Sequence, residues 1–200
     1  MPVLRSRKLL SMLRLSTFVL SGAGLAIFGL GASSAQADVK AATILGTSSD
    51  VLPQAQGQVI LRVDGRLGRG NVVEGNKTSA EFDLDMLRHF EARTISTSTI
   101  WSSGRADFRG ASLAAVLDAI GAKGQTLRLT ALNDYTIDMP VTMIETDVPI
   151  LAYEMNGTLL SSRDKGPLWL IYPFDSSAKY QNEENYSRAV WQLVRIEVLP

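Results

Sequence analysis

The sequence predicts an α+β domain that is mainly β and carries two or more short helices. Several short runs of apolar and β-branched residues, bounded by Gly, Pro, Asn or Asp, are typical of strands. Only two segments show the spacing of apolar residues that an amphipathic helix needs. These helices do not alternate with strands as β-α-β units, which argues against a parallel α/β sheet. The chain has no internal repeat and no second region of different composition, so we expect one domain.

The first predicted elements are a strand, a loop and a helix. Residues 58–65, QVILRVDG, predict a strand that Asp-Gly closes, and the Gly-rich residues 66–78 are expected to form a loop. In residues 82–90, FDLDMLRHF, apolar side chains recur at i, i+4, i+5 and i+8. This spacing predicts a short helix with Asp83 near its N-terminus.

The clearest predicted helix follows a strand that is rich in hydroxyl side chains. Residues 93–101, RTISTSTIW, alternate without Gly or Pro and predict a strand that runs into a loop at residues 102–109. Residues 111–121, ASLAAVLDAIG, place four apolar side chains on one stripe and end at Gly121. This pattern predicts a helix with Gly121 as its C-terminal stop.

The remainder of the chain is expected to form strands. Asn156-Gly157 between two apolar runs is the strongest hairpin signal in the sequence. Residues 133–135, NDY, are expected to form a turn. The strands are predicted at residues 125–132, 136–140, 150–160 (the hairpin), 167–173 and 189–199.

Residues 1–37 have the pattern of a secretory signal peptide. Basic residues precede an apolar run that contains Gly, and the small residues Ala35 and Ala37 form a signal-peptidase site before Asp38. We therefore expect a mature chain of residues 38–200, a single domain, located in the periplasm. An uncleaved membrane anchor is the alternative. Such a compartment permits disulfides, but the chain contains no Cys.

The residue types exclude several kinds of site. The only His is His89, inside a predicted helix, so a Ser-His-Asp triad is not expected. With one His and no Cys, the chain lacks the usual ligands of a tight zinc or copper site. Removal of the basic residues 1–37 leaves a mildly acidic chain, which disfavours nucleic acid as a partner.

Three predicted loops combine aromatic or cationic side chains with polar neighbours. Such a set suits a flat heteroaromatic ligand that stacks on a ring and is held at its edge by charged hydrogen bonds. The alternative for each loop is structural, with the Trp residues in the core and residues 163–165 in a solvated turn. The candidate ligand-binding residues are Trp101 and Arg105, then Asn133, Asp134 and Tyr135, then Arg163, Asp164, Lys165, Trp169 and Tyr172.

Four sequence segments in a fixed order resemble a known family. They are FRGASLAAVLDAIG, ALNDYTIDMP, ILAYEMNGTLLSSRDKGPLWLIYP and VWQLVRIEV. Together they resemble the oxidoreductase molybdopterin-binding domain, which has the sulfite-oxidase fold, over about residues 95–200. The resemblance implies this fold for the chain.

The resemblance also carries an expectation about the cofactor. Enzymes of the family hold molybdenum through the dithiolene of the cofactor and one Cys thiolate. Here Thr97 or a neighbour occupies the position of that Cys, and Trp169 stands where an Arg is common. A hydroxyl is a hard and poorly ionised substitute for a thiolate.

Small Cys-less exported members of this fold are similar to the chain and look like periplasmic pterin-binding sensors. They report to an inner-membrane diguanylate cyclase or phosphodiesterase. The resemblance implies a metal-free pterin, reduced or oxidised, as the ligand in preference to molybdopterin, and no turnover. On this view Asp134 or Asp164 would accept hydrogen bonds from the amino-pyrimidinone edge, while Arg105 or Arg163 would face the opposite side. The alternatives are a subunit of a molybdopterin-dependent oxidoreductase and an exported interaction domain that has lost its site.

Overall fold

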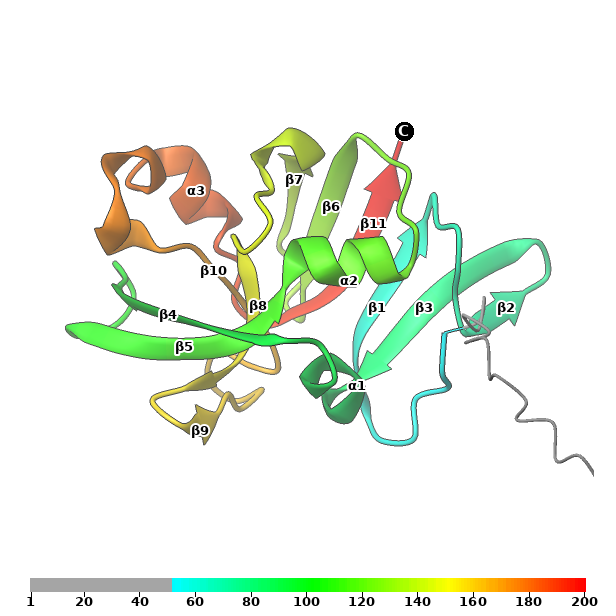
Figure 1. Cartoon of the computed structure of the whole chain (residues 1–200), viewed down its shortest axis with the longest axis horizontal. Helices are drawn as coiled ribbons and strands as arrows, with labels where there is room; N and C mark the ends of the chain where they lie inside the picture. The colour runs from blue at the N-terminus through cyan, green and yellow to red at the C-terminus, as the bar shows by residue number, and fades with distance from the viewer. Residues whose placement is uncertain (1–51) are drawn as a thin grey trace, which may run out of the picture. The chain divides into compact units, whose positions relative to one another are not determined.

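The computed structural model describes residues 52–200 (Figure 1). The predicted signal peptide, residues 1–37, and the start of the predicted mature chain lie outside these residues. Within residues 52–200, no helix is long and apolar enough to cross a membrane.

One sheet has six strands and contains both the first and the last strand of the described chain. Its strands are β1 (Val59–Gly65), β2 (Val72–Glu74), β3 (Lys77–Asp83), β6 (Thr126–Ala131), β7 (Thr136–Pro140) and β11 (Leu193–Leu199). Their order across the sheet is β2-β3-β1-β11-β6-β7. β1 and β11 pair in parallel, with Arg62 opposite Arg195, and the neighbouring pairs are antiparallel. The last strand, β11, therefore lies inside the sheet, between β1 and β6.

The second sheet is built from the middle of the chain. Its strands are β4 (Ala92–Ser98), β5 (Arg105–Ser112), β8 (Ile150–Met155), β9 (Thr158–Leu159) and β10 (Trp169–Ile171). The order is β10-β8-β5-β4, and β9 pairs with β8 as the second arm of a hairpin. Gly110 allows β5 and β8 to approach closely, because a Cβ at this position would lie 2.0 Å from the carbonyl oxygen of Leu151.

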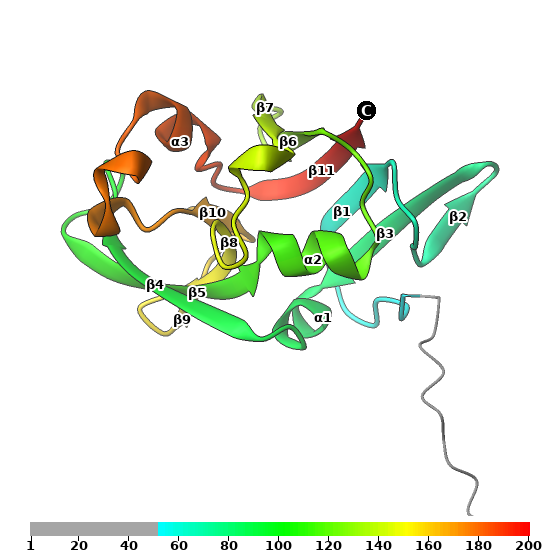
Figure 2. The ribbon, with the colours of Figure 1, turned by 45° about the horizontal axis from the view of Figure 1, so that its top comes forward.

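The helices are short. They are α1 (Leu84–Arg88), α2 (Leu113–Ala119) and α3 (Glu183–Arg188), together with the 3₁₀ turns η1 (Val141–Met143), η2 (Phe174–Ser176) and η3 (Ala178–Tyr180). α2 begins at Ser112, whose hydroxyl accepts a hydrogen bond from the Ala115 N–H, and is followed by Gly121 at φ 58°. Figures 1 and 2 both show α2 beside the inner strands of the six-stranded sheet.

The buried side chains form a large core cluster and a smaller one. Leu113 and Val116 of α2 join the larger cluster with Leu127 and Leu129 of β6. The smaller cluster is centred on Trp169, with residues of β4, β5 and β8 around it. Trp101 packs against both clusters from the connection between β4 and β5.

The predicted fold class and most of the predicted elements are confirmed, and four details are wrong. Residues 66–78 contain β2 and the start of β3, because Gly75 at φ 60° makes a tight hairpin turn rather than a long loop. Residues 105–109 are not loop but belong to β5, in which charged and buried residues alternate. α3 was not predicted because its residues are polar and its start depends on the Asn182 cap. The last strand begins at Leu193 rather than at residue 189.

Asp83 ties the beginning of the described chain to α1, and its removal is expected to destabilise the fold. The carboxylate accepts hydrogen bonds of 2.8 Å from the N–H groups of Met86, Gln56 and Gly57. Asp83→Ala should lower the free energy of unfolding by about 2–4 kcal/mol, from the lost cap and the unpaired N–H groups. Urea unfolding measures this loss. Asp85→Ala, at an exposed position of the same helix, is the control and should change stability by less than about 0.5 kcal/mol.

The effect of Asp83 should also depend on pH in a defined direction. The hydrogen bonds from Met86 and Gly57 hold the pKa of Asp83 below its usual value. The stabilisation is therefore present above about pH 4, the ordinary pKa of Asp, and is lost as the pH falls through the lower pKa of the folded state. The stability difference between wild type and Asp83→Ala should shrink in acid. A difference that grows in acid would contradict this assignment.

Candidate functional site

A pocket lies where three connections between elements meet. The β4–β5 connection supplies Trp101, the β6–β7 connection supplies Asn133 and Tyr135, and the segment from α3 to β11 supplies the third wall. The pocket has a volume of about 260 Å³. Its lining residues are Trp101, Ala131, Asn133, Tyr135, Tyr186, Ser187, Ala189, Val190 and Trp191. Ligand pockets of drug-sized molecules span about 300–1,000 Å³, so this one suits a compact ring system.

Trp101 is fixed in the pocket wall by edge-to-face contacts with other aromatic rings. Its ring centroid lies 5.6 Å from that of Trp191 and 6.1 Å from that of Tyr186, with interplanar angles of 84° and 78°. The ring centroid of the fully buried Trp169 also lies 6.1 Å from that of Trp101. Such T-shaped pairs are favourable arrangements of aromatic quadrupoles and restrict each ring. The wall is therefore preorganised.

The hydroxyl side chains before Trp101 have structural roles in the described residues. The Thr99 hydroxyl accepts a hydrogen bond from the Trp101 N–H at 3.2 Å and pairs with the Ser102 hydroxyl at 2.7 Å. Thr97 is fully buried, and its hydroxyl accepts from the Asp175 N–H at 3.0 Å. The Ser98 hydroxyl and N–H both donate to the Asp175 carboxylate, which lowers the pKa of Asp175. These hydroxyls hold the hairpin against η2 and set the position of Trp101.

Asn133 and Tyr135 supply the polar groups of the second wall. The Asn133 side-chain oxygen accepts a hydrogen bond from the Tyr135 N–H at 3.2 Å, as in an Asx turn. The Tyr135 hydroxyl donates to the Ser187 carbonyl oxygen at 3.2 Å and so links the second wall to the third. The Asn133 amide nitrogen forms no hydrogen bond within residues 52–200, so it can donate to a ligand.

Lys165 places a positive charge beside the aromatic wall. Its ammonium lies 5.6 Å from the ring centroid of Trp169 and 5.7 Å from that of Trp191, within the range of cation–π attraction. It also pairs with the Asp164 carboxylate at 3.2 Å. The Lys165 carbonyl accepts from the Gln192 N–H at 2.9 Å, which anchors this loop to the segment before β11.

The structure brings some of the predicted residues together and leaves others apart. Trp101, Asn133 and Tyr135 line the pocket, and Lys165 and Trp169 lie against its aromatic wall. The predicted residues that do not line the pocket are Trp169, which is fully buried, Lys165, the exposed Asp134, Arg163 and Asp164, and also Arg105 and Tyr172.

Arg105 and Tyr172 have other partners. Arg105 lies on β5, donates to the Ser96 carbonyl oxygen and faces Asp175 at 3.8 Å. Tyr172 is buried, its hydroxyl donates to the Met139 sulfur at 3.1 Å, and burial raises its pKa above the usual value. Neither side chain lines the pocket, because strand register and burial, which the sequence does not display, give both of them other partners.

Two aromatic residues of the pocket were missed. Tyr186 lies on the unpredicted helix α3, and Trp191 lies in residues 189–192, which were assigned to a strand. Trp191 stands within one of the four segments that carry the family resemblance, and this position could have identified it. Tyr186 carries no comparable signal.

Comparison with known families assigns the chain. The model of the oxidoreductase molybdopterin binding domain matches residues 73–180. The chain belongs to this family. Its fold is similar to that in the crystal structure of the sulfane dehydrogenase SoxCD from Paracoccus pantotrophus, with a TM-score of 0.53 and 16% sequence identity. The similarity covers 74% of this chain and 40% of the SoxCD chain, so the chain spans less than half of that protein's length. No curated protein matches the sequence.

The residues of this family member do not fit thiolate ligation of molybdenum. The whole chain has no Cys, and Thr97 is held by the Asp175 N–H away from the pocket lining. Within residues 52–200 no group of three His, Cys, Asp or Glu side chains is placed to hold a metal ion. The aromatic pocket does fit the ring system of a pterin, since its walls are rings and its polar groups are few.

Gln192 joins the loop of Lys165 to the pocket, and its truncation should weaken both. Its side-chain amide donates to the carbonyl oxygens of Ser162 and Asp164 at 2.8 and 3.2 Å. Gln192→Ala should lower the free energy of unfolding by about 1–2 kcal/mol and loosen the loop. We expect pterin affinity to fall by about three- to tenfold. Gln181→Ala, which loses one hydrogen bond to Phe174 outside the pocket, is the matched control and should leave affinity unchanged.

Proposed function

We propose that this chain binds a pterin, without metal and without turnover, in the pocket between Trp101, Asn133, Tyr135 and Trp191. One observation carries the proposal: a molybdopterin-binding domain that lacks any Cys has a pocket walled by aromatic rings. A bicyclic heteroaromatic ring gains most from such walls, because stacking and edge-to-face contacts need planar partners.

The polar groups of the pocket match the edge of a pterin in part. The Asn133 amide can donate to a ring nitrogen or carbonyl of the ligand. Stacking contributes about 1–3 kcal/mol per ring and a neutral hydrogen bond about 1 kcal/mol. After the ordering costs of binding, these contributions correspond to a Kd of about 1–100 μM. Such affinity suits a ligand that must also dissociate.

Other features support binding rather than catalysis. His89, the only His of the chain, lies just after α1 and outside the pocket. No carboxylate lines the pocket, so neither a paired-carboxylate site nor a nucleophile with its base is present among the described pocket residues.

We extend the proposal to location and partner. The basic and apolar residues 1–37 with Ala35 and Ala37 support export to the periplasm. A periplasmic domain can act on the cytoplasm only through a membrane protein. We therefore propose an inner-membrane signalling partner, such as a diguanylate cyclase or phosphodiesterase, that responds to the ligand state of this chain.

A subunit of a molybdopterin-dependent oxidoreductase is the second candidate, favoured by the family match itself. The test is to purify the chain from its native host, extract bound small molecules for fluorescence and mass spectrometry, and measure molybdenum. We expect a pterin without molybdenum. Stoichiometric molybdenum with a dithiolene pterin would overturn the proposal in favour of the oxidoreductase.

A further inference from the structure

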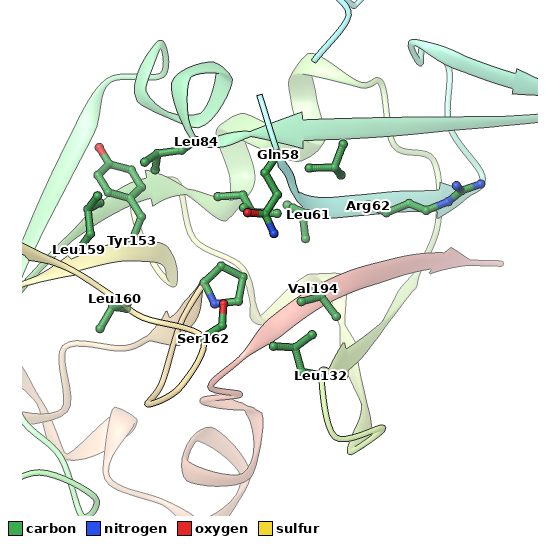
Figure 3. A pocket seen from close by; sticks show the side chains of 13 residues that line it. Gln58, Leu61, Arg62, Leu84, Leu132, Tyr153, Leu159, Leu160, Ser162 and Val194 are labelled. Carbon is green, nitrogen blue, oxygen red and sulfur yellow. The ribbon is translucent and has the colours of Figure 1, made fainter. Parts of the chain in front are cut away.

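A second hollow, the hairpin groove, is lined in part by the β6–β7 connection, which also supplies residues to the pocket. It has a volume of about 300 Å³. Figure 3 shows Leu159 and Leu160 on one side of it and Val194 and Leu132 on the other. Its lining residues are Gln58, Val59, Ile60, Leu61, Arg62, Leu84, Leu132, Tyr153, Leu159, Leu160, Ser162, Pro167 and Val194.

The hairpin groove gathers exposed aliphatic side chains. Leu132, Leu159 and Val59 are 51%, 47% and 40% exposed, and they account for half of the large hydrophobic residues that the described chain exposes. Single exposed apolar residues are common, but a group of them around one hollow marks a site of contact with another molecule.

The groove and the pocket share their walls. In the β6–β7 connection, Leu132 faces the groove while Asn133 and Tyr135 line the pocket. Trp191, just before β11, lines the pocket, and Val194, the second residue of β11, lines the groove. The loop of residues 160–167 contributes Leu160, Ser162 and Pro167 to the groove.

Gln192 forms hydrogen bonds with two other segments, the β6–β7 connection and the loop of residues 160–167. Its carbonyl oxygen accepts from the Leu132 N–H at 2.9 Å, and its N–H donates to the Lys165 carbonyl oxygen at 2.9 Å. Its backbone has φ 51°, in the left-handed region that a non-Gly residue rarely adopts. Gln192 therefore links Leu132, which lines the groove, to Trp191, which lines the pocket and precedes Gln192 in the chain.

The charges of the groove indicate the chemistry of its occupant. No carboxylate lines the groove, and the guanidinium of its one charged lining residue, Arg62, already pairs with carboxylates of the sheet, of which Glu81 is at 3.0 Å. Arg163, next to the lining residue Ser162, is exposed and forms no ion pair within residues 52–200. A complementary surface would place aliphatic side chains in the hollow and a carboxylate near Arg163.

We infer that the hairpin groove docks a segment of a partner protein that carries aliphatic anchors and an adjacent carboxylate, and that ligand in the pocket changes this docking. The second half rests on the proposed function. Because neighbouring residues of the same segments line the two hollows, ligand in the pocket would act on the groove through Leu132 and Gln192. Couplings between sites of this kind change affinity by about five- to 150-fold.

Site-specific photo-crosslinking in the native host tests the docking. The photoreactive residue p-benzoylphenylalanine is placed at Leu132 or Leu159, and at Val73 as the control, which is 71% exposed on β2 outside the groove. We expect one protein to crosslink from both groove positions and not from the control. Mass spectrometry should map the crosslink to an aliphatic segment with an Asp or Glu beside it.

Purified partner then tests both halves of the inference. Leu159→Asp should weaken the complex by about tenfold or more, while Val73→Asp should change it by less than about twofold. Adding tetrahydrobiopterin should shift the affinity of the wild-type complex by about fivefold or more. Leu159→Asp should still bind tetrahydrobiopterin as the wild type does.

The contrary outcomes are distinct. Crosslinks to a second copy of this chain, to lipid, or to nothing from either groove position would overturn the docking. If the affinity of the complex is the same with and without tetrahydrobiopterin, the coupling is wrong. If the wild type binds no pterin, the proposed function fails, whereas the crosslinks still decide the docking.

Discussion

Trp101→Ala should lower the affinity of the chain for a pterin by about one to two orders of magnitude, because it removes a ring of the pocket wall that three other aromatic rings contact. Loss of one stacked aromatic contact costs about 1–3 kcal/mol, and each 1.4 kcal/mol is a factor of ten in Kd. The ring contacts Trp191, Tyr186 and Trp169, so its removal also frees the remaining wall to move. Isothermal titration with tetrahydrobiopterin measures the change.

Two matched variants separate binding from folding in this experiment. Trp101→Phe keeps an aromatic ring in the wall and should recover most of the affinity. Ile100→Ala changes the exposed neighbour in the same connection and should leave affinity as in wild type. If Trp101→Ala folds, as judged by circular dichroism, and binds with wild-type affinity, the pterin does not use this wall.

Trp169→Ala lowers the free energy of unfolding by about 3–5 kcal/mol, the usual cost of removing a large buried aromatic side chain. Trp169 is fully buried at the centre of the smaller core cluster, 5.3 Å from the ring of Phe108. Its indole N–H donates to the Ala189 carbonyl oxygen at 3.0 Å, which ties β10 to the third wall of the pocket. Denaturant unfolding measures the loss.

The control for Trp169→Ala is the removal of an aromatic side chain that lines the pocket and is not buried. Tyr135 is 45% exposed, so Tyr135→Ala should cost less than about 1.5 kcal/mol of stability while it weakens pterin binding. A stability loss below about 1 kcal/mol for Trp169→Ala would contradict its assignment as a core residue.

The sequence predicted the elements whose side chains alternate or repeat cleanly. β1, β6 and α2 were predicted because one face of each is buried and apolar, and β8 because a run of buried apolar residues precedes the Asn156-Gly157 turn. β5 was assigned in part to a loop because Arg105, Asp107 and Arg109 occupy its exposed face and mask the alternation. The parallel pairing of β1 with β11 joins residues from opposite ends of the described chain, and local patterns do not encode such pairing.

Of the candidate ligand-binding residues, three line the pocket that the structure shows. Residues on the first two connections, Trp101, Asn133 and Tyr135, came together because the β4–β5 and β6–β7 connections end at the same place. The charged residues Asp134, Arg163 and Asp164 are exposed and lie outside the pocket lining, to which the loop of residues 160–167 contributes no residue. Alternation within a turn depends on backbone angles, such as φ 62° at Asp134, that composition does not fix.

The measurement that tests the central claim most directly is a titration of the purified chain with tetrahydrobiopterin, followed by tryptophan fluorescence. Trp101 and Trp191 line the pocket, so ligand should quench their emission. We predict saturable quenching with a Kd of about 1–100 μM, and its loss in Trp101→Ala. No saturable change up to about 100 μM ligand, or equal quenching in the variant, would contradict the assignment of this pocket as the pterin site.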